Sequence, residues 1–337
     1  ALWLSTLDEK REAGEILYDL AIVENRASQA HKAFIVLAIP QYEETFLPNF
    51  RNGDVVVLYE RNKDTDNVTN KMVFKGNIES ITDSELRIRL RASQRNPLVF
   101  PENSRYAVEH DTMDTTFRSM YLGLSSFMDA NPERRDLLLG QRPPRFDTAY
   151  ENRIACATDD FERVALKAVA ARDYFLLVGP PGTGKTSRAL RRMVEHFYAC
   201  PSMQILLLAY TNRAVDEICQ SLSSIRPQVD YIRVGSELSC DARFRKHLLE
   251  NVLSECNNRR EVNIRMADCR IYVGTVASIA SKSELFKLKH FDVAIVDEAT
   301  QILEPQLLGV LCARFKDGRN GIGKFILIGD HKQLPAV

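Results

Sequence analysis

Near the start of the chain, apolar side chains recur at helical spacing. Leu7, Leu17, Leu20 and Val23 leave an apolar stripe between charged positions. Side chains roughly three to four residues apart lie on one face of a helix. The pattern therefore predicts an amphipathic helix over residues 7–27 that packs against a neighbouring element.

From about residue 31 to residue 111 the pattern changes to an alternation of apolar and polar residues. Short runs rich in β-branched and other apolar residues are separated by turn-forming residues. The clearest runs are 33–37, 55–59, 72–74 and 86–90. Short strands separated by turn residues predict a small β-barrel or sandwich, and we place a β-barrel at 31–111.

The last of these strands carries three arginines at alternate positions. Because side chains alternate across a strand, Arg87, Arg89 and Arg91 are expected to share one face. Such a face could follow a row of phosphates. An ordinary solvated face of a sheet is the other interpretation, and we favour it.

Helical spacing returns over residues 114–129. Two helices would then flank the strands, as expected for a β module carried on a helical stalk. A segment rich in Pro and Arg follows at 140–145, and we place the domain boundary there. The expected division is a helical stalk and linker at 1–30 and 112–148, a β-barrel at 31–111, and an α/β domain at 149–337.

Beyond residue 150, short apolar runs alternate with longer segments of helical character. Continuous apolar runs are typical of strands that are buried on both faces of a parallel sheet. We therefore expect an α/β domain that binds its ligands at the carboxyl ends of its strands. The predicted strands are 174–178, 205–209, 231–234, 271–274, 293–296 and 325–328.

The composition is that of an ordinary globular chain, with 45% apolar and 27% charged residues. No apolar run approaches the ~20 residues of a membrane span, so no membrane partner is predicted. Lys plus Arg and Asp plus Glu both number 45, so any contact with nucleic acid has to rest on local charge. The seven cysteines include no C-x-x-C pair. They predict reduced thiols in an intracellular protein, in the cytoplasm or in the nucleus or nucleoid.

The segment after the predicted strand 174–178 fits the pattern G-x-x-x-x-G-K-[ST]. Glycines let backbone N–H groups converge on phosphate oxygens, and the N-terminus of the following helix adds positive partial charge. Lys185 is predicted to neutralise the β- and γ-phosphates, and the Thr186 hydroxyl to ligate magnesium. The predicted phosphate-binding residues are Gly179, Pro180, Pro181, Gly182, Thr183, Gly184, Lys185 and Thr186.

Polar residues also follow two later strands. Asp297 and Glu298 come directly after 293–296, and Gln333 comes shortly after 325–328. A carboxylate at a strand tip, such as Asp297, can hold magnesium. Glu298 is placed to deprotonate a water, which is hydrolase chemistry. Gln333 is predicted to contact the γ-phosphate or the attacking water.

Together, these motifs resemble those of the superfamily 1 helicases, in the branch that contains the nonsense-mediated-decay RNA helicase and the nuclease-helicase of Okazaki-fragment processing. The similar segments are GPPGTGKT at 179–186, AYTNRAVD at 209–216, GTVAS at 274–278, DEATQ at 297–301 and GDHKQLP at 329–335. The resemblance is strong over 150–337 and weaker over 1–150. It implies a RecA-like domain that uses ATP and Mg²⁺, preceded by a small β-barrel on a helical stalk.

The resemblance also implies a motor that moves along single-stranded DNA in the 5′-to-3′ direction. An RNA helicase of the decay type and an ATP-switched nucleic-acid clamp without unwinding are the alternatives. Motifs of a second RecA-like domain, which supplies arginines across the ATP cleft, are absent from the sequence. We therefore expect a piece of a longer protein that hydrolyses hardly any ATP alone.

In the family, residues at the positions of Thr211, Asn212, Thr275 and Ser278 contact nucleic-acid phosphates. Hydroxyl, amide and helix N-terminal N–H groups suit such contacts. Thr211 is also a good helix N-cap, and the same ambiguity applies to Thr275 and Ser278. The two roles are compatible.

One predicted nucleotide contact departs from the family. Its adenine-reading glutamine is replaced here by Glu162. Glutamine can accept a hydrogen bond from adenine N6 and donate one to N7, whereas an ionised glutamate can only accept. Glu162 is thus the predicted base-contacting residue, with an altered selectivity for the base.

Overall fold

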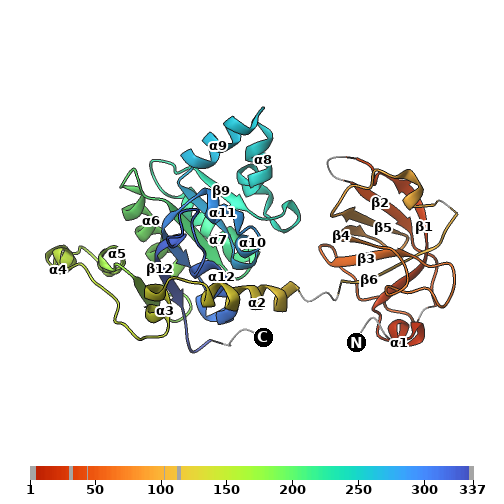
Figure 1. Cartoon of the computed structure of the whole chain (residues 1–337), viewed down its shortest axis with the longest axis horizontal. Helices are drawn as coiled ribbons and strands as arrows, with labels where there is room; N and C mark the ends of the chain where they lie inside the picture. The colour runs from red at the N-terminus through yellow and green to blue at the C-terminus, as the bar shows by residue number, and fades with distance from the viewer. Residues whose placement is uncertain (1–4, 30–32, 44, 102, 112–114, 334–337) are drawn as a thin grey trace. The chain divides into compact units, whose positions relative to one another are not determined.

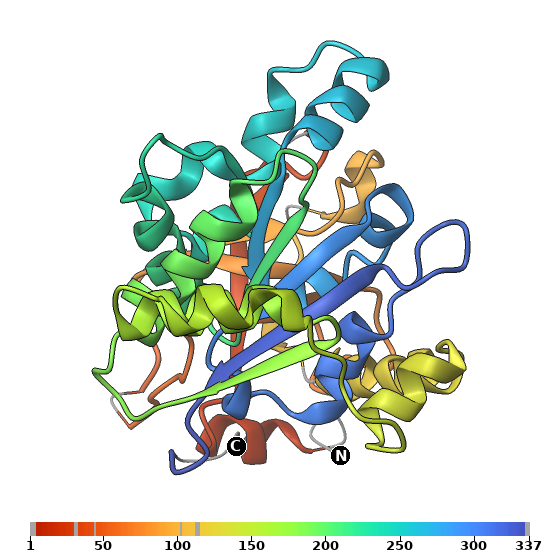
Figure 2. The same cartoon turned by 90° about the vertical axis from the view of Figure 1, so that its left-hand side faces the viewer.

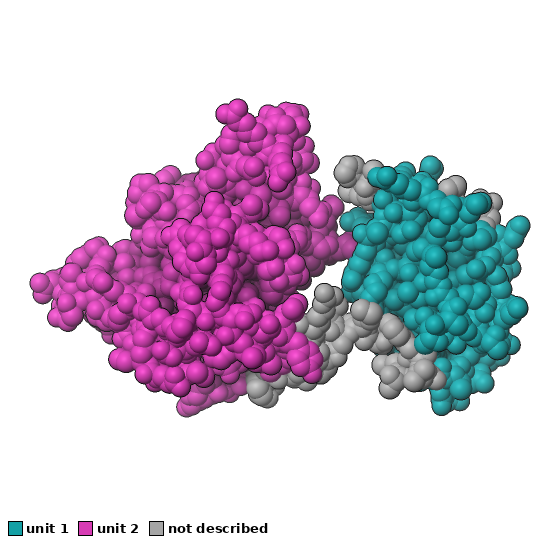
Figure 3. Space-filling view, in the orientation of Figure 1, with its two compact units in different colours: residues 1–114 teal, residues 115–337 magenta. Residues whose placement is uncertain are grey.

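The computed structural model describes residues 5–29, 33–43, 45–101, 103–111 and 115–333. The chain divides into two units, unit 1 at residues 1–114 and unit 2 at residues 115–337 (Figures 1 and 3). Each unit has its own hydrophobic core.

Unit 1 is a closed barrel of six antiparallel strands in the order β1-β2-β5-β4-β3-β6 (Figure 1). Inward-facing side chains such as Leu17, Ile35, Leu58 and Ile88 are completely buried and form its core. Closure leaves no free strand edge, and the predicted β-barrel is confirmed. The strands are β1 (Ile16–Asn25), β2 (Phe34–Ala38), β3 (Val55–Glu60), β4 (Val73–Ile81), β5 (Glu85–Leu90) and β6 (Tyr106–His110).

The prediction of a helix over residues 7–27 is wrong. Only α1 (Leu7–Glu12) is helical, and β1 follows it. The register of β1 against β6 shifts between Leu17 and Leu20, where Asp19 has a φ of 55°. A bulge of this kind adds a residue and breaks the alternation of a strand. Leu17 and Leu20 are therefore both buried, although they are separated by the three-residue spacing that is typical of one face of a helix.

The arginines of β5 lie on an ion-paired sheet face. Arg87 Nε donates to Glu79 Oε2 at 2.8 Å, and Arg89 donates to the other oxygen of the same carboxylate. The guanidinium of Arg87 lies 3.7 Å from the centre of the Phe34 ring. Because these charges are already partnered within the barrel, the structure favours the solvated sheet face over the row of phosphate contacts.

Unit 2 contains a sheet of six parallel strands in the order β7-β12-β11-β8-β10-β9 (Figure 2). One strand, β12, separates β7, which precedes the phosphate-binding segment 179–186 (the P-loop), from β11, which precedes Asp297 and Glu298 (the carboxylate strand). The predicted parallel α/β fold is confirmed. The strands are β7 (Tyr174–Val178), β8 (Ile205–Ala209), β9 (Tyr231–Val234), β10 (Ile271–Thr275), β11 (Phe291–Val296) and β12 (Ile322–Gly329).

Helices cover both faces of this sheet. On one face, α5, α6 and α7 pack against residues such as Leu207 and Ile295; on the other, α3, α10, α11 and α12 pack against residues such as Leu206 and Ala294. Strands that are buried on both faces are continuously apolar, which is why their positions could be predicted well from the sequence. The helices are α2 (Thr115–Met128), α3 (Pro132–Leu138), α4 (Glu151–Ala155), α5 (Asp160–Ala170), α6 (Arg191–Tyr198), α7 (Asn212–Ser223), α8 (Leu249–Ser254), α9 (Arg259–Asp268), α10 (Val276–Ala280), α11 (Glu284–Leu288) and α12 (Glu304–Leu311).

The segment 140–145 does not separate two domains. Arg142 and Arg145 each place a guanidinium nitrogen 2.8 Å from the same carboxylate oxygen of Asp173. Hydrogen bonds from these two side chains hold the pKa of Asp173 well below its ordinary range. The segment is thus tied to the start of β7, and the division between the units falls at 114–115. The predicted helix at 114–129 is α2, and it belongs to unit 2.

Two further expectations concern the thiols and the membrane. All seven cysteines are free thiols, as predicted. None of the helices in the described part of the chain combines the length and the apolar composition that a membrane crossing needs.

Close packing of α2 on α12 gives a prediction about stability. A Cβ added at Gly123 would lie 1.8 Å from the carbonyl oxygen of Pro305. Because the two helices would have to move apart, we expect Gly123→Ala to lower the free energy of unfolding by about 1–3 kcal/mol in urea denaturation. At Gly235 nothing lies within 4 Å of an added Cβ, so the control Gly235→Ala should change stability by less than about 0.5 kcal/mol. Equal losses in the two variants would contradict the packing.

Candidate active site

The P-loop connects β7 to a helix that begins at Lys185. Gly182 and Gly184 have φ values of 77° and 82°, in the left-handed region that side chains disfavour. A Cβ at Gly184 would also lie 3.3 Å from the ring of Phe161. A π-helical segment, Lys185–Leu190, then leads into α6. The loop therefore has the glycine-dependent form of a phosphate cradle at a helix N-terminus.

The side chain of Lys185 folds back over the loop. Its Nζ donates to the carbonyl oxygen of Gly179 and, at 2.9 Å, to that of Pro180. Thr183 Oγ1 donates to the same Pro180 carbonyl at 2.8 Å. These contacts place the ammonium group beside the loop whose N–H groups are suited to phosphate oxygens.

β11 brings the first predicted carboxylate to the P-loop. Thr186 Oγ1 donates to Asp297 Oδ2, and the backbone N–H of Glu298 donates to Asp297 Oδ1 at 3.0 Å. Asp297 is only 2% exposed, and this burial raises its pKa above the ordinary value. The two predicted magnesium ligands, Thr186 and Asp297, are thus in direct contact.

The donors at this position suit magnesium. Hydroxyl and carboxylate oxygens are the hard ligands that Mg²⁺ prefers, and the ion usually takes its remaining ligands from water and substrate phosphates. Among the described residues, no group of three His, Cys, Asp or Glu side chains could hold a metal. Thr186 and Asp297 are the side chains at this position that could hold such an ion.

Glu298 lies at a sharp turn after β11. Its backbone is left-handed, with φ 52° and ψ 34°, a conformation that costs of order 1 kcal/mol in a residue other than glycine. Burial first, and then the charges of Asp297 and Glu217, raise the pKa of its carboxyl group. A raised pKa gives the carboxylate the proton affinity that a general base needs.

These groups line one cavity of about 400 Å³. Its only cationic side chain among the described residues is that of Lys185. Predicted site residues in the lining are Pro181, Gly182, Thr183, Gly184, Lys185, Thr186, Asp297, Glu298 and Gln333. Four further lining residues were not predicted from the sequence: Ser187, Glu217, Gly329 and Asp330.

Two of the missed residues are acidic. Asp330 directly follows β12 and is buried, and its carbonyl accepts a hydrogen bond from the N–H of Gln333 at 3.1 Å. Its place in the same motif as Gln333 could have identified it. Glu217 reaches the cavity because α7 packs beside the P-loop helix, where Ser221 Oγ donates to the Thr186 carbonyl at 3.4 Å. Nothing in the local sequence indicates this.

Glu162, the predicted base-contacting residue, is not among the described residues that line the cavity. Its carboxylate lies 3.0 Å from His196 Nε2 and 4.0 Å from Arg192 Nε, both on α6. The neighbouring Phe161 lies against Gly184 of the loop, and the base contact of Glu162 stays a prediction.

The four predicted nucleic-acid contacts divide into two pairs. Thr211 accepts a hydrogen bond from Ala214 N at 3.1 Å and caps α7, yet Thr211 and Asn212 are both exposed. Thr275 and Ser278 form a capping box at the start of α10, and Thr275 is buried. Helix capping thus explains the positions of the Thr211, Thr275 and Ser278 side chains. Thr211 and Asn212 are nevertheless exposed to solvent.

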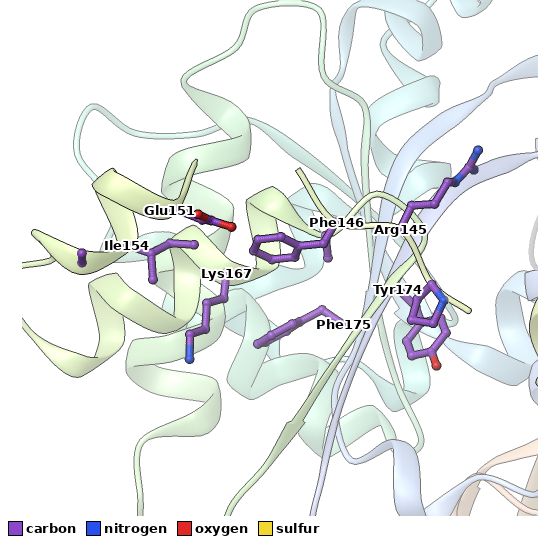
Figure 4. A pocket seen from close by; sticks show the side chains of 10 residues that line it. Arg145, Phe146, Glu151, Ile154, Lys167, Tyr174 and Phe175 are labelled. Carbon is purple, nitrogen blue, oxygen red and sulfur yellow. The ribbon is translucent and has the colours of Figure 1, made fainter. Parts of the chain in front are cut away.

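A second cavity, of about 440 Å³, is lined mainly by apolar residues at the other end of β7 (Figure 4). Phe146, Ile154, Tyr174 and Phe175 contribute to it. Tyr174 is the first residue of β7, whereas the P-loop follows the last one. None of the predicted site residues lines this cavity.

Comparisons with known proteins agree on one family. A family profile described as an AAA domain matches residues 158–268 and 257–337. A DNA replication ATP-dependent helicase/nuclease DNA2 from Bos taurus is 26% identical over 99% of this chain and 31% of its own length. The protein of the same name from Gallus gallus is 30% identical over 72% of this chain and 25% of its own length.

An RNA helicase also matches. The putative ATP-dependent RNA helicase ECM32 of Saccharomyces cerevisiae is 30% identical over 60% of this chain and 21% of its own length. The chain thus spans about a third or less of the curated relatives that it matches.

Proposed function

Since the chain belongs to the AAA-domain family and to the superfamily 1 helicases of the DNA2 and nonsense-mediated-decay branch, we propose that it forms the ATP-hydrolysing part of a nucleic-acid helicase or translocase. The observation that supports the proposal best is the single cavity that combines the P-loop with Asp297, Glu298 and Gln333. Two carboxylates beside a phosphate-binding loop suit hydrolysis of the γ-phosphate better than transfer of that phosphoryl group to a second substrate.

The P-loop would bind the phosphates of ATP. Its backbone N–H groups and the helix N-terminus surround the β-phosphate, and Lys185 exchanges its contacts with the Gly179 and Pro180 carbonyls for phosphate oxygens. Thr186 and Asp297 would hold Mg²⁺, which supplies positive charge against the β- and γ-phosphates.

Glu298 would act as the general base. It accepts a proton from a water whose oxygen attacks the γ-phosphorus in line, and the bond to the β-phosphate oxygen breaks as ADP leaves. Gln333, from the turn after β12, lines the same cavity and would orient this water or contact the γ-phosphate.

Single-stranded nucleic acid would bind at the same edge of the sheet. Thr211 and Asn212 follow β8, whose carboxyl end adjoins those of β11 and β10, and both are exposed. Thr275 at the end of β10 and Ser278 on α10 lie next along this edge, but their capping box and the burial of Thr275 make them weaker candidates for the strand contact. DNA and 5′-to-3′ movement are favoured by the resemblance to the nuclease-helicase, and an intracellular location follows from such a substrate. RNA is the second candidate, supported by the match to an RNA helicase.

An ATPase assay followed by a strand-displacement assay on the full-length protein tests this function. We expect phosphate release that single-stranded DNA stimulates, and displacement of a strand from a duplex with a 5′ overhang. Stimulation by RNA alone would identify the decay-type helicase. Stimulated hydrolysis without displacement would indicate a clamp.

Thr211 allows its capping role and its proposed phosphate contact to be separated. Thr211→Asp should keep the stability of the protein, because aspartate caps helices as well as threonine does. The added charge should repel a phosphate, so we expect affinity for a single strand to fall about tenfold or more in fluorescence anisotropy. The control Thr211→Ser keeps the hydroxyl and should keep the affinity. Unchanged binding by Thr211→Asp would exclude Thr211 from the strand contact.

A further inference from the structure

We propose that the ion pair between Arg213 and Glu217 on α7 couples the strand contact to the nucleotide cavity. A strand phosphate that binds Arg213 leaves the charge of Glu217 uncompensated in the cavity, and this charge weakens the binding of nucleotide. The inference rests on the proposed function and deepens it by naming how the strand regulates the nucleotide site.

The helix α7 reaches both proposed sites. Thr211 caps its N-terminus and Asn212 is its first residue, and both are exposed. Arg213 is the next residue, and Glu217, four residues further on, lines the P-loop cavity. Residues four apart lie on the same side of a helix. The strand contact and the nucleotide cavity are thus about one helical turn apart on a single element.

The ion pair between these two side chains is easily exchanged. Arg213 Nε lies 3.7 Å from Glu217 Oε1, and the side chains are 91% and 59% exposed. A pair as exposed as this one adds little stability, because water solvates both charges. A phosphate group accepts two parallel hydrogen bonds from a guanidinium group, which makes it a stronger partner. A phosphate bound beside Thr211 and Asn212 would therefore compete with Glu217 for Arg213.

The helix itself is fixed at two further positions. Asp216 pairs with Arg233 of β9, whose side chain is only 1% exposed. Ser221 Oγ donates to the Thr186 carbonyl of the P-loop helix at 3.4 Å. Because α7 is tied both to the sheet and to the P-loop helix, exchange of a side-chain partner can act on the cavity without any movement of the helix.

The charge of the cavity makes it sensitive to this exchange. Among the described lining residues, four are carboxylates and one, Lys185, is cationic. Arg213 offsets the charge of Glu217 until a strand phosphate binds it, and Glu217 then repels the phosphates of a nucleotide. We expect a loss of nucleotide affinity of about threefold. Because coupling between two binding sites is reciprocal, nucleotide should lower the affinity for the strand by the same factor.

Nucleotide binding to the full-length protein, with and without a saturating oligothymidylate, tests the proposal. The probe is adenylyl imidodiphosphate, a non-hydrolysable analogue of ATP, which displaces a ribose-labelled fluorescent nucleotide in the presence of Mg²⁺. The coupling factor is its dissociation constant with the strand divided by that without the strand. We expect a factor of about three or more for the unmodified protein, and a factor about threefold smaller for Arg213→Ala and for Glu217→Gln. The double variant should match the single variants, because the two residues act as one unit.

The strand-free affinities and two controls distinguish coupling from a structural defect. Without strand, Arg213→Ala should bind the probe about threefold more weakly, whereas Glu217→Gln should bind it at least as tightly as the unmodified protein. Arg213→Lys keeps the cation and should keep the coupling. Arg191→Ala removes a similar pair, 3.6 Å from Glu195 on α6 and outside the cavity lining, and should leave the coupling factor unchanged.

The outcomes separate this inference from the proposed function. A coupling factor close to one in the unmodified protein, or a factor that stays undiminished in Arg213→Ala or in Glu217→Gln, would overturn the inference and leave the proposed function intact. If the unmodified protein binds neither nucleotide nor strand, the proposed function fails, and the inference fails with it.

Discussion

Replacing Lys185 by alanine should lower ATP turnover by the full-length protein by about 10²–10³-fold. Lys185 is the one cationic side chain among the described residues that line the P-loop cavity, and Glu217, Asp297, Glu298 and Asp330 line it with carboxylates. Its ammonium group already lies on the loop, 2.9 Å from the Pro180 carbonyl. Without Lys185, no cationic side chain of this lining would stabilise the negative charge that develops on the γ-phosphate in the transition state.

Steady-state phosphate release at saturating ATP measures this effect. The control Lys287→Ala removes an exposed lysine from α11, a helix outside the cavity, and should leave the rate unchanged. A near-normal rate in Lys185→Ala would mean that the P-loop is not the site of hydrolysis.

Glu298→Gln should bind ATP and magnesium but hydrolyse the nucleotide about 10²–10⁴-fold more slowly. The substitution leaves the Thr186–Asp297 contact in place and removes only the group that accepts the proton of the attacking water. Nucleotide binding should therefore stay within about threefold of the unmodified protein, while turnover falls by orders of magnitude.

Glu217→Gln is the matched control for this division of roles. Glu217 lines the same cavity but comes from α7 instead of the carboxylate strand. We expect a much smaller loss of turnover than in Glu298→Gln. If the two variants lose turnover equally, or if Glu298→Gln loses nucleotide binding, the assignment of the base is wrong.

The α/β unit could be predicted from the sequence because its strands and site motifs are recognisable from short, continuous segments of the chain. Strands such as β8 and β11 are buried on both faces, so they appear as continuous apolar runs. The P-loop and Asp297 are adjacent to such strands along the chain. Parallel strands then bring their carboxyl ends to one edge of the sheet. Thr186 and Asp297 meet at this edge, although β12 lies between the strands that precede them.

What could not be predicted depends on packing between distant segments or on a local irregularity. Because of the bulge at Asp19, the apolar residues of the first barrel strand recur at a helical spacing, so the sequence predicts a helix there. The pairing of Glu162 with His196 depends on how α5 lies against α6. The position of 140–145 is set by the ion pairs of Arg142 and Arg145 with Asp173, which neither spacing nor composition indicates.

The central claim is that this cavity hydrolyses ATP in response to a bound nucleic-acid strand. The most direct measurement is phosphate release by the full-length protein with magnesium and ATP, as single-stranded DNA is added. We predict a rate that rises with the strand to a plateau, at least about tenfold above the rate without it. A rate that does not respond to either DNA or RNA, or a stimulated rate that persists in Lys185→Ala, would contradict the account.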